Sequence, residues 1–117
     1  MRGIIVDDAT ITRMRLREIL DKAFDIVAEG SNGMEALALF SEFKPDFLTL
    51  DISMPQVNGL DALRNILEEY PAAKVVIVSA AGQKQIVFEA LRLGAKDFII
   101  KPFDPERVLK AVKRLFV

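Results

Sequence analysis

The feature that most constrains the fold is a regular alternation, along the whole chain, between short apolar runs rich in branched residues and segments with helical periodicity. The apolar runs, which we expect to be strands, cover residues 2–6, 25–29, 46–50, 74–78 and 97–100. The segments between and after them predict helices from the residues after Asp8 to about Ala23, at 32–43, from 58 to about 70, at 83–93 and from 104 onward. Unbroken hydrophobic strands are typical of parallel sheets that are buried on both faces. Five strand–helix repeats with right-handed crossovers therefore predict an α/β fold, a doubly wound parallel sheet with helices on both sides.

Residues at the ends of the expected helices support these boundaries. Asn32 and Glu35 have the spacing of a capping box, and Asn58-Gly59 is a plausible helix start. Gly94 is suited to end a helix, while Asp104-Pro105 combines an N-cap residue with the residue favoured at the first helical position. Asp8, taken alone, would be a helix N-cap more often than a metal ligand.

The composition excludes several classes of function. The chain has 117 residues and a formal net charge of −1, so it has no global field to attract nucleic acid or a membrane, and we expect a monomeric single domain. It has no cysteine, which excludes disulfides and thiolate sites, and no histidine. No apolar run approaches the about 20 residues of a membrane span, and the N-terminus does not resemble a signal peptide, so we expect a cytoplasmic protein.

Polar residues follow four of the five expected strands, at the ends where ligands bind in open parallel sheets. These residues are Asp7, Asp8, Asp51, Ser79 and Lys101. Three carboxylates within about 4 Å of one another would repel by roughly 4 kcal/mol per pair at an effective dielectric of about 20, which predicts a bound cation. A site built only from oxygen ligands favours Mg²⁺. Lys101 and Ser79 could then hold the oxygens of a phosphoryl group, which leaves Asp51 as the nucleophile.

Six motifs extend this pattern over nearly the whole chain. They are Ile4–Asp8, Ser31–Leu37, Lys44–Asp46, Leu50–Gly59, Val78–Ala80 and Gly94–Phe103. Together they resemble the receiver domains of response regulators in bacterial two-component systems, most closely the single-domain regulators of chemotaxis. The resemblance implies a flavodoxin-like sheet with strand order 2-1-3-4-5 and five helices, formed by residues 1–117 as one receiver domain with no output domain.

The resemblance also implies roles for individual residues. Asp51 would be the phosphoacceptor, and Asp8 and Asp51 would be direct Mg²⁺ ligands. Asp7 would support the metal through water, and the backbone carbonyl of Ser53 would be a further ligand.

The remaining implied roles concern the phosphoryl group and the switch. Ser79 and Lys101 would hold the phosphoryl group. Phe98 would swing inward when the Ser79 hydroxyl moves toward the phosphoryl group. The peptide bond between Lys101 and Pro102 would be cis.

The function implied is a signalling switch rather than an enzyme, since it would catalyse only its own phosphoryl transfer and dephosphorylation. A histidine kinase would donate the phosphoryl group, and a downstream protein would bind the face of the fourth helix, fifth strand and fifth helix, including Phe88 and Phe98. Phe88 lies off the apolar stripe of its helix, and a buried or an exposed position is equally compatible with the sequence. Three arginines in the first helix, Arg13, Arg15 and Arg17, are expected to form a solvated face.

Three other functions remain as alternatives. A Mg²⁺-dependent phosphohydrolase of the haloacid dehalogenase type would also use an aspartyl-phosphate, but it would place its second acid two residues after the nucleophile and carry a cap domain. A carrier of flavin mononucleotide would need a phosphate loop where this chain has Asp7 and Asp8. A scaffold without chemistry would not need all five site residues.

Overall fold

The computed structural model describes residues 1–53 and 59–117, and its centre is a five-stranded parallel sheet in the order β2-β1-β3-β4-β5. The strands are β1 (Arg2–Val6), β2 (Asp25–Gly30), β3 (Phe47–Asp51), β4 (Val75–Ala80) and β5 (Asp97–Lys101). The predicted strands and the predicted order are both confirmed. β3 and β4 extend one and two residues further than predicted, which places Asp51 and Ser79 inside strands.

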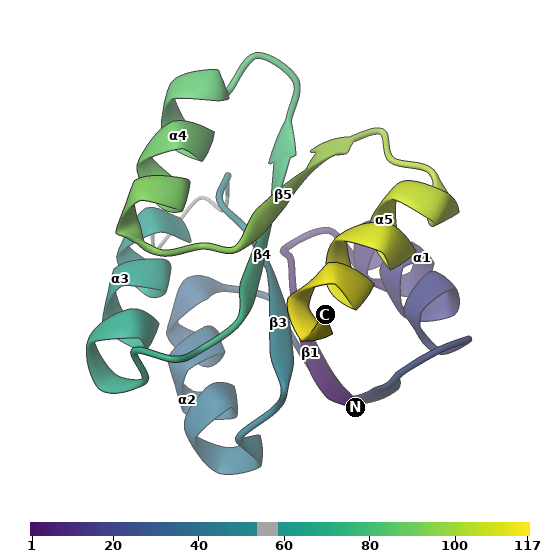
Figure 1. Ribbon diagram of the computed structural model, residues 1–117, viewed down its shortest axis with the longest axis horizontal. Helices are drawn as coiled ribbons and strands as arrows, with labels where there is room; N and C mark the ends of the chain where they lie inside the picture. Colours follow the sequence, from purple (N-terminus) through teal and green to yellow (C-terminus); the bar gives the residue numbers. More distant parts are fainter. Residues whose placement is uncertain (54–58) are drawn as a thin grey trace.

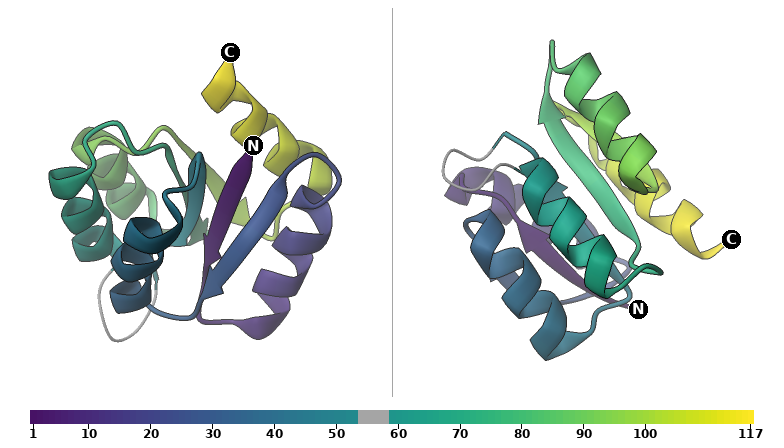
Figure 2. Two further views of the ribbon diagram at one scale, coloured as in Figure 1. Left: turned by 90° about the horizontal axis from the view of Figure 1, so that it is seen from below. Right: turned by 90° about the vertical axis from the view of Figure 1, so that its left-hand side faces the viewer.

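Helices cover both faces of this sheet. They are α1 (Thr10–Leu20), α2 (Gly33–Phe43), α3 (Gly59–Glu69), α4 (Lys84–Leu93) and α5 (Pro105–Lys113), the last followed by a 3₁₀ turn at Arg114–Phe116. α1 and α5 lie on one face, and α2, α3 and α4 lie side by side on the other (Figures 1 and 2). The doubly wound architecture is therefore confirmed. The predicted loop before α3 and its predicted start at Asn58 lie outside the described residues.

The sheet separates two hydrophobic cores because successive side chains of a strand point to opposite faces. On β4, Val75 and Ile77 belong to the core beneath α2, α3 and α4, while Val76 and Val78 belong to the core beneath α1 and α5. All four are at most 1% exposed. Each such side chain stabilises the fold by about 1.5–3 kcal/mol, so the central strands and the residues at their ends are firmly placed.

α1 is shorter than its periodicity predicted. It ends at Leu20 rather than near residue 23, and the N–H groups of Ala23 and Phe24 both donate to the Leu20 carbonyl. This turn brings the Phe24 ring against Phe47, with 5.1 Å between the ring centroids. The segment after Leu20 thus forms a turn, and Phe24 contributes to the core instead of to the face of a longer helix.

The helix starts are partly as predicted. Asn32 accepts from the Glu35 N–H at 3.0 Å, and Asp104 accepts from the Arg107 N–H at 2.9 Å, so both caps are confirmed. The prediction that Asp8 caps α1 is wrong. The N-cap is Ala9, with no side-chain cap, and the carboxylate of Asp7 accepts the Ala9 N–H instead, at 2.9 Å.

No helix in the described part of the chain is both long enough and apolar enough to cross a lipid bilayer.

Candidate functional site

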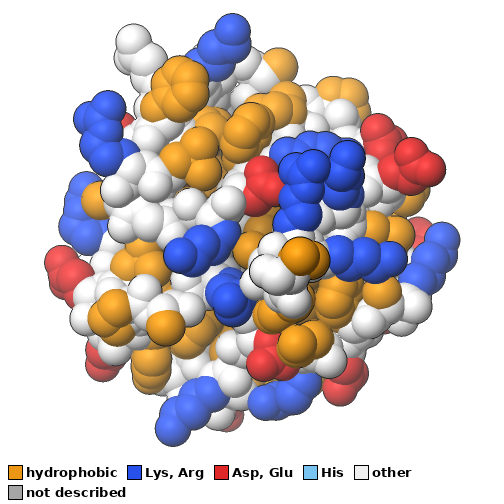
Figure 3. All heavy atoms as spheres, in the orientation of Figure 1, with side chains coloured by type: hydrophobic (Ala, Val, Ile, Leu, Met, Phe, Trp, Pro, Cys, Tyr) orange, Lys and Arg blue, Asp and Glu red, His pale blue; other side chains and the backbone are white. Residues whose placement is uncertain are grey.

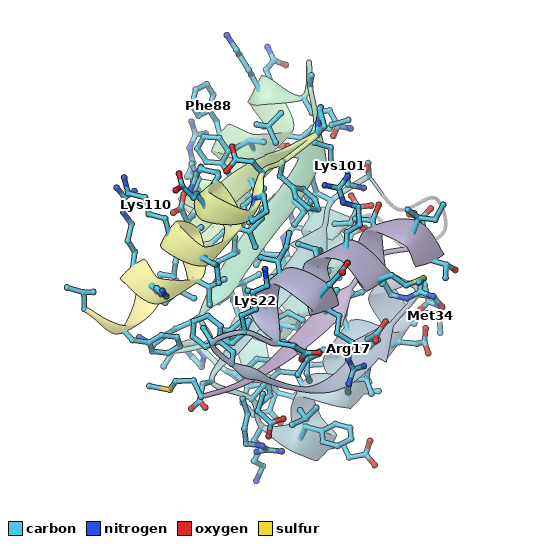
Figure 4. All side chains as sticks on the ribbon, turned by 90° about the vertical axis from the view of Figure 1, so that its right-hand side faces the viewer. Arg17, Lys22, Met34, Phe88, Lys101 and Lys110 are labelled. Carbon is cyan, nitrogen blue, oxygen red and sulfur yellow. The ribbon has the colours of Figure 1, made fainter. Side chains whose placement is uncertain are left out.

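The polar residues predicted to converge do lie along one edge of the sheet, where β1, β3, β4 and β5 end. Parallel pairing sets Val6 beside Leu50, Asp51 beside Val78, and Ala80 beside Lys101. The residues that end or follow these strands therefore share this edge. Figure 4 shows Lys101 at this end of the sheet, close to several carboxylate oxygens.

Three carboxylates meet at this edge and form what we call the acid cluster, Asp7, Asp8 and Asp51. One oxygen from each lies within 4.8 Å of the others. Asp7 and Asp51 are buried, at 0% and 1% exposed, whereas Asp8 is exposed. At this separation, ionised carboxylates repel by roughly 3 kcal/mol per pair at an effective dielectric of about 20. Burial, aided by the charge of Asp51, raises the pKa of Asp7, although a hydrogen bond from Ala9 opposes the rise.

Lys101 partly neutralises the acid cluster. Its Nζ lies 3.2 Å from Asp7 Oδ2 and 3.2 Å from Asp51 Oδ2. Burial alone would lower the pKa of Lys101, but attraction to Asp51 and Asp7 outweighs it, and the net result is a raised pKa. One ammonium group thus faces three carboxylates in the part of the chain that the structure describes. When all are ionised, the site has the charge and the oxygen donors to hold a divalent cation.

Asp51 is oriented by two further groups. Its Oδ1 accepts from the Ser53 N–H at 2.9 Å and from the Ser53 hydroxyl at 2.7 Å. Gly59, at the start of α3, packs against the backbone after Asp51 so closely that an added Cβ would lie 2.3 Å from Ile52 Cα. The backbone that follows Asp51 is therefore fixed by packing as well as by hydrogen bonds. The contacts observed for Ser53 come from its amide and hydroxyl, and no contact of its carbonyl is observed among the described residues.

The Ser79 hydroxyl is buried and has no partner in the described part of the chain. Ser79 is 0% exposed and follows Val78, the residue paired with Asp51. Its Oγ receives or donates no hydrogen bond among the described residues. Leaving a buried polar group unpaired costs about 1–3 kcal/mol, so such a group in a native structure calls for an explanation. A ligand oxygen bound beside Asp51 would supply the missing partner.

Two further predictions concern the neighbourhood of the site. The peptide bond between Lys101 and Pro102 is cis, the isomer that the sequence predicted. Phe98 lies half-buried in β5, with the guanidinium carbon of Arg107 5.8 Å from its ring centroid.

Phe88 on α4 is 62% exposed, which resolves the question that the sequence left open. Ile100 of β5 is also exposed, at 37%. In the space-filling view, hydrophobic side chains gather between α4 and β5, with Lys and Arg side chains alongside over α5 (Figure 3). This surface has the mixed character of a protein-binding face.

The prediction that the arginines of α1 form a solvated face is only partly right, because Arg15 is exposed whereas Arg13 is largely buried. The Arg13 side chain is only 17% exposed and donates to the Asp7 carbonyl, and Arg17 binds Glu29 of β2. Arg15 lies over the Phe103 ring, 5.7 Å from its centroid. The sequence contained one indication for Arg13 and Arg17, the acid Glu29 near the end of the neighbouring strand, but the prediction did not use it.

Comparisons with known proteins agree with this geometry. Residues 4–113 match the family model described as the response regulator receiver domain. The chain is 47% identical over 115 residues to the chemotaxis protein CheY of Thermotoga maritima, covering 97% of this chain and 96% of that protein. It is 49% identical over 115 residues to the protein CcdB of Bacillus subtilis, again covering 97% and 96%. The CheX–CheY–BeF₃–Mg²⁺ complex from Borrelia burgdorferi contains a chain of similar structure, with a TM-score of 0.94 and 38% identity over 100% of this chain and 90% of that one.

Proposed function

The chain belongs to the response regulator receiver domains of two-component systems, and we propose that it is a switch set by phosphorylation of Asp51 in the presence of Mg²⁺. One observation carries the proposal. A buried carboxylate, Asp51, stands beside two more acids and contacts Lys101, and the residue after its strand partner, Ser79, has a buried hydroxyl with no partner among the described residues. Such a site has an unmet need for positive charge and for a hydrogen-bonding ligand, and a metal together with a phosphoryl group would meet both.

The phosphoryl donor in this proposal is a phosphohistidine of a histidine kinase, as the resemblance to two-component receiver domains implies. The chain has no histidine, so it cannot itself be this donor. A carboxylate oxygen of Asp51 attacks the phosphorus, an O–P bond forms and the N–P bond breaks. The imidazole of the donor keeps the electron pair of that bond and takes up a proton. Lys101 and Ser79 hold oxygens of the transferred group, which stabilises its spread charge.

The residues that would hold Mg²⁺ are Asp8 and Asp51 directly, Asp7 through water, and the carbonyl of Ser53. The oxygen donors and the excess of negative charge suit this ion, which keeps several waters and needs only one or two carboxylates. Asp8, the exposed member of the acid cluster, leaves the site open to solvent. When bound, Mg²⁺ supplies the positive charge that lets the acids and a phosphoryl oxygen approach one another.

The output of the switch is a changed protein-binding surface. Movement of the Ser79 hydroxyl toward the phosphoryl group would free space into which Phe98 turns, and this alters the face of α4, β5 and α5 that includes Phe88. Complete switching from 1:99 to 99:1 needs about 5.5 kcal/mol of differential stabilisation, within reach of a doubly charged group in a buried site. The target is a protein, and resemblance to CheY proteins supports a role in chemotaxis.

The test is phosphorylation by a small acyl phosphate in the presence of Mg²⁺, followed by intact mass measurement. We expect one labile phosphoryl group, which hydroxylamine removes as it does other acyl phosphates, and none in Asp51→Asn. Asp61→Asn, which changes an exposed acid paired with Arg64, serves as the matched control and should be labelled normally. An unchanged mass would refute the switch, and steady turnover of phosphate esters without a labelled protein would support the phosphohydrolase.

A further inference from the structure

The turn after β1 carries two of the three acids of the acid cluster, and the backbone N–H and the carbonyl of its first residue, Asp7, both accept or donate a hydrogen bond. The N–H of Asp7 donates to the Gly30 carbonyl of β2 at 3.0 Å. The carbonyl of Asp7 accepts from Arg13 Nη1 at 2.6 Å. Because the peptide unit that joins Asp7 to Asp8 is planar, fixing its carbonyl fixes the direction in which the chain enters Asp8.

Arg13 is itself held in place from several directions. Its Nε lies 3.4 Å from Glu29 Oε1, and its Nη2 donates to the hydroxyl of Thr10 at 3.3 Å. Its backbone N–H donates to the Ala9 carbonyl in the first turn of α1. Its side chain is only 17% exposed. A planar guanidinium held in this way can orient the Asp7 carbonyl, since little of its freedom remains.

Glu29 joins Arg13 to a second arginine, and we call Arg13, Glu29 and Arg17 the arginine–glutamate brace. Arg17 Nη1 donates to Glu29 Oε2 at 2.5 Å, and Arg17 Nη2 donates to the Ile26 carbonyl at 3.1 Å. Figure 4 shows Arg17 on the side of α1 near β2. Arg17 shares its residue type, its helix and its acid partner with Arg13, but its observed contacts are with β2 and Asp21 rather than with the turn. It is a built-in control for any role of Arg13 at the turn.

We infer that Arg13 is a positioning residue for the metal site: it holds the Asp7 carbonyl so that the Asp8 carboxylate faces Asp51. The inference rests on the proposed Mg²⁺ site and adds a residue to it that touches no carboxylate of the acid cluster in the contacts described. Without the guanidinium, the turn samples other orientations, and Asp8 spends less time in the position that binds. Loss of a group that orients a metal ligand weakens metal binding by about 10- to 100-fold. We expect an effect near the lower value, because the Gly30 contact remains.

The test compares Mg²⁺ affinity of the full chain in three variants, measured by isothermal titration calorimetry, with thermal melting in EDTA alongside. Arg13→Met keeps the aliphatic stem, and we expect its Mg²⁺ affinity to fall about tenfold. Arg17→Met should lose similar thermal stability, because it also gives up a bond to Glu29, while its Mg²⁺ affinity stays within about twofold of wild type. Arg13→Lys, whose ammonium can still reach one acceptor, should regain part of the affinity.

Two results would overturn the inference: wild-type Mg²⁺ affinity in Arg13→Met, or an equal loss of affinity in Arg17→Met, which would mean that the effect follows general stability. If Arg13→Met does not fold, Arg13→Gln, which removes the charge and shortens the side chain, carries the test, since wild-type affinity in that variant contradicts the role. Wild-type protein that binds Mg²⁺ and becomes labelled on Asp51 upholds the proposed function whatever the arginine variants do. The two failures are thereby separable.

Discussion

The acid cluster and the arginine–glutamate brace are linked by the hydrogen bond from Arg13 to the Asp7 carbonyl, yet their charges are arranged in opposite ways. In the brace, one carboxylate, Glu29, lies between two guanidinium groups, and each of its oxygens has a partner. In the acid cluster, three carboxylates face the single ammonium of Lys101 among the described residues. Every charge of the brace is paired, whereas the acid cluster retains unpaired negative charge until a cation binds. Both regions are charged, and the acid cluster differs from the brace in that its charges are not balanced.

The largest expected effect comes from removing the ammonium that moderates the imbalance. Lys101→Met leaves Asp7 and Asp51 buried beside each other, and we expect the metal-free protein to lose about 2–3 kcal/mol of unfolding free energy. This range allows for the 25% exposure of the Lys101 side chain. Denaturant unfolding in EDTA measures the loss. Lys22→Met, at an exposed lysine, should stay within about 0.5 kcal/mol of wild type, and an equal loss there would contradict the explanation.

The same chemical change should have opposite signs in the two regions. Asp51→Asn removes one of three repelling charges, so we expect the metal-free protein to gain about 1–2 kcal/mol. Glu29→Gln leaves two guanidinium groups without their shared anion, so we expect a loss of about 1 kcal/mol, reduced because Arg17 is partly exposed. Unfolding of both variants in EDTA gives the comparison directly. Two losses, or two gains, would show that the regions do not differ in the way described.

Two buried hydroxyls sharpen the comparison further. Thr49 of β3 and Ser79 of β4 are both 0% exposed, and the side-chain oxygen of each has no partner among the described residues. Thr49→Val and Ser79→Ala should each raise stability by about 1 kcal/mol, because an unpaired polar group is replaced by an apolar one. Only Ser79→Ala should also slow phosphorylation of Asp51, which stopped-flow or mass measurements would follow. If Thr49→Val slows it equally, the Ser79 hydroxyl has no special role.

The smallest expected effect concerns pH. Hydrogen bonds from the backbone and hydroxyl of Ser31 lower the pKa of Glu35, so its ionised form stabilises the fold above its unfolded pKa near 4.5. That contribution is lost as the pH falls through the lower, folded value. The pKa of Asp7 is raised, so its contribution has the opposite sign and is lost as the pH rises.

Melting temperatures in EDTA between about pH 3 and pH 7 should therefore converge for wild type and Glu35→Gln at low pH and separate slightly above it. The corresponding difference in unfolding free energy is about a few tenths of a kcal/mol at most, because Glu35 is exposed. A separation that grows as the pH falls would contradict the assignment.

The sequence predicted the sheet and most of the site because both depend on local patterns and on one topological rule. Unbroken apolar runs mark each strand, and in a parallel sheet the residues after the strands must share an edge, which brings Asp7, Asp51 and Lys101 together. Caps at Asn32 and Asp104 follow from a contact three residues away, so their sequence spacing was sufficient.

The predictions that proved wrong depended on contacts between distant segments. α1 ends before Phe24, whose ring packs against Phe47 of β3. Arg13 and Arg17 both pair with Glu29 of β2, although only Arg13 is largely buried, and helical periodicity alone cannot show which strand lies beside a helix. The missed cap has a similar cause, since Asp7 rather than Asp8 points back toward α1 once the turn is fixed from both sides.

The acid cluster and its neighbours come from the ends of four strands that are far apart in sequence, so no fragment of the chain could assemble them. Occupancy of the site is consequently coupled to the integrity of the entire sheet. Binding a cation should slow amide hydrogen exchange along β1, β3 and β4 down to their far ends, and not only beside the ligand. An ion bound at the ends of the strands would therefore stabilise the whole sheet against unfolding.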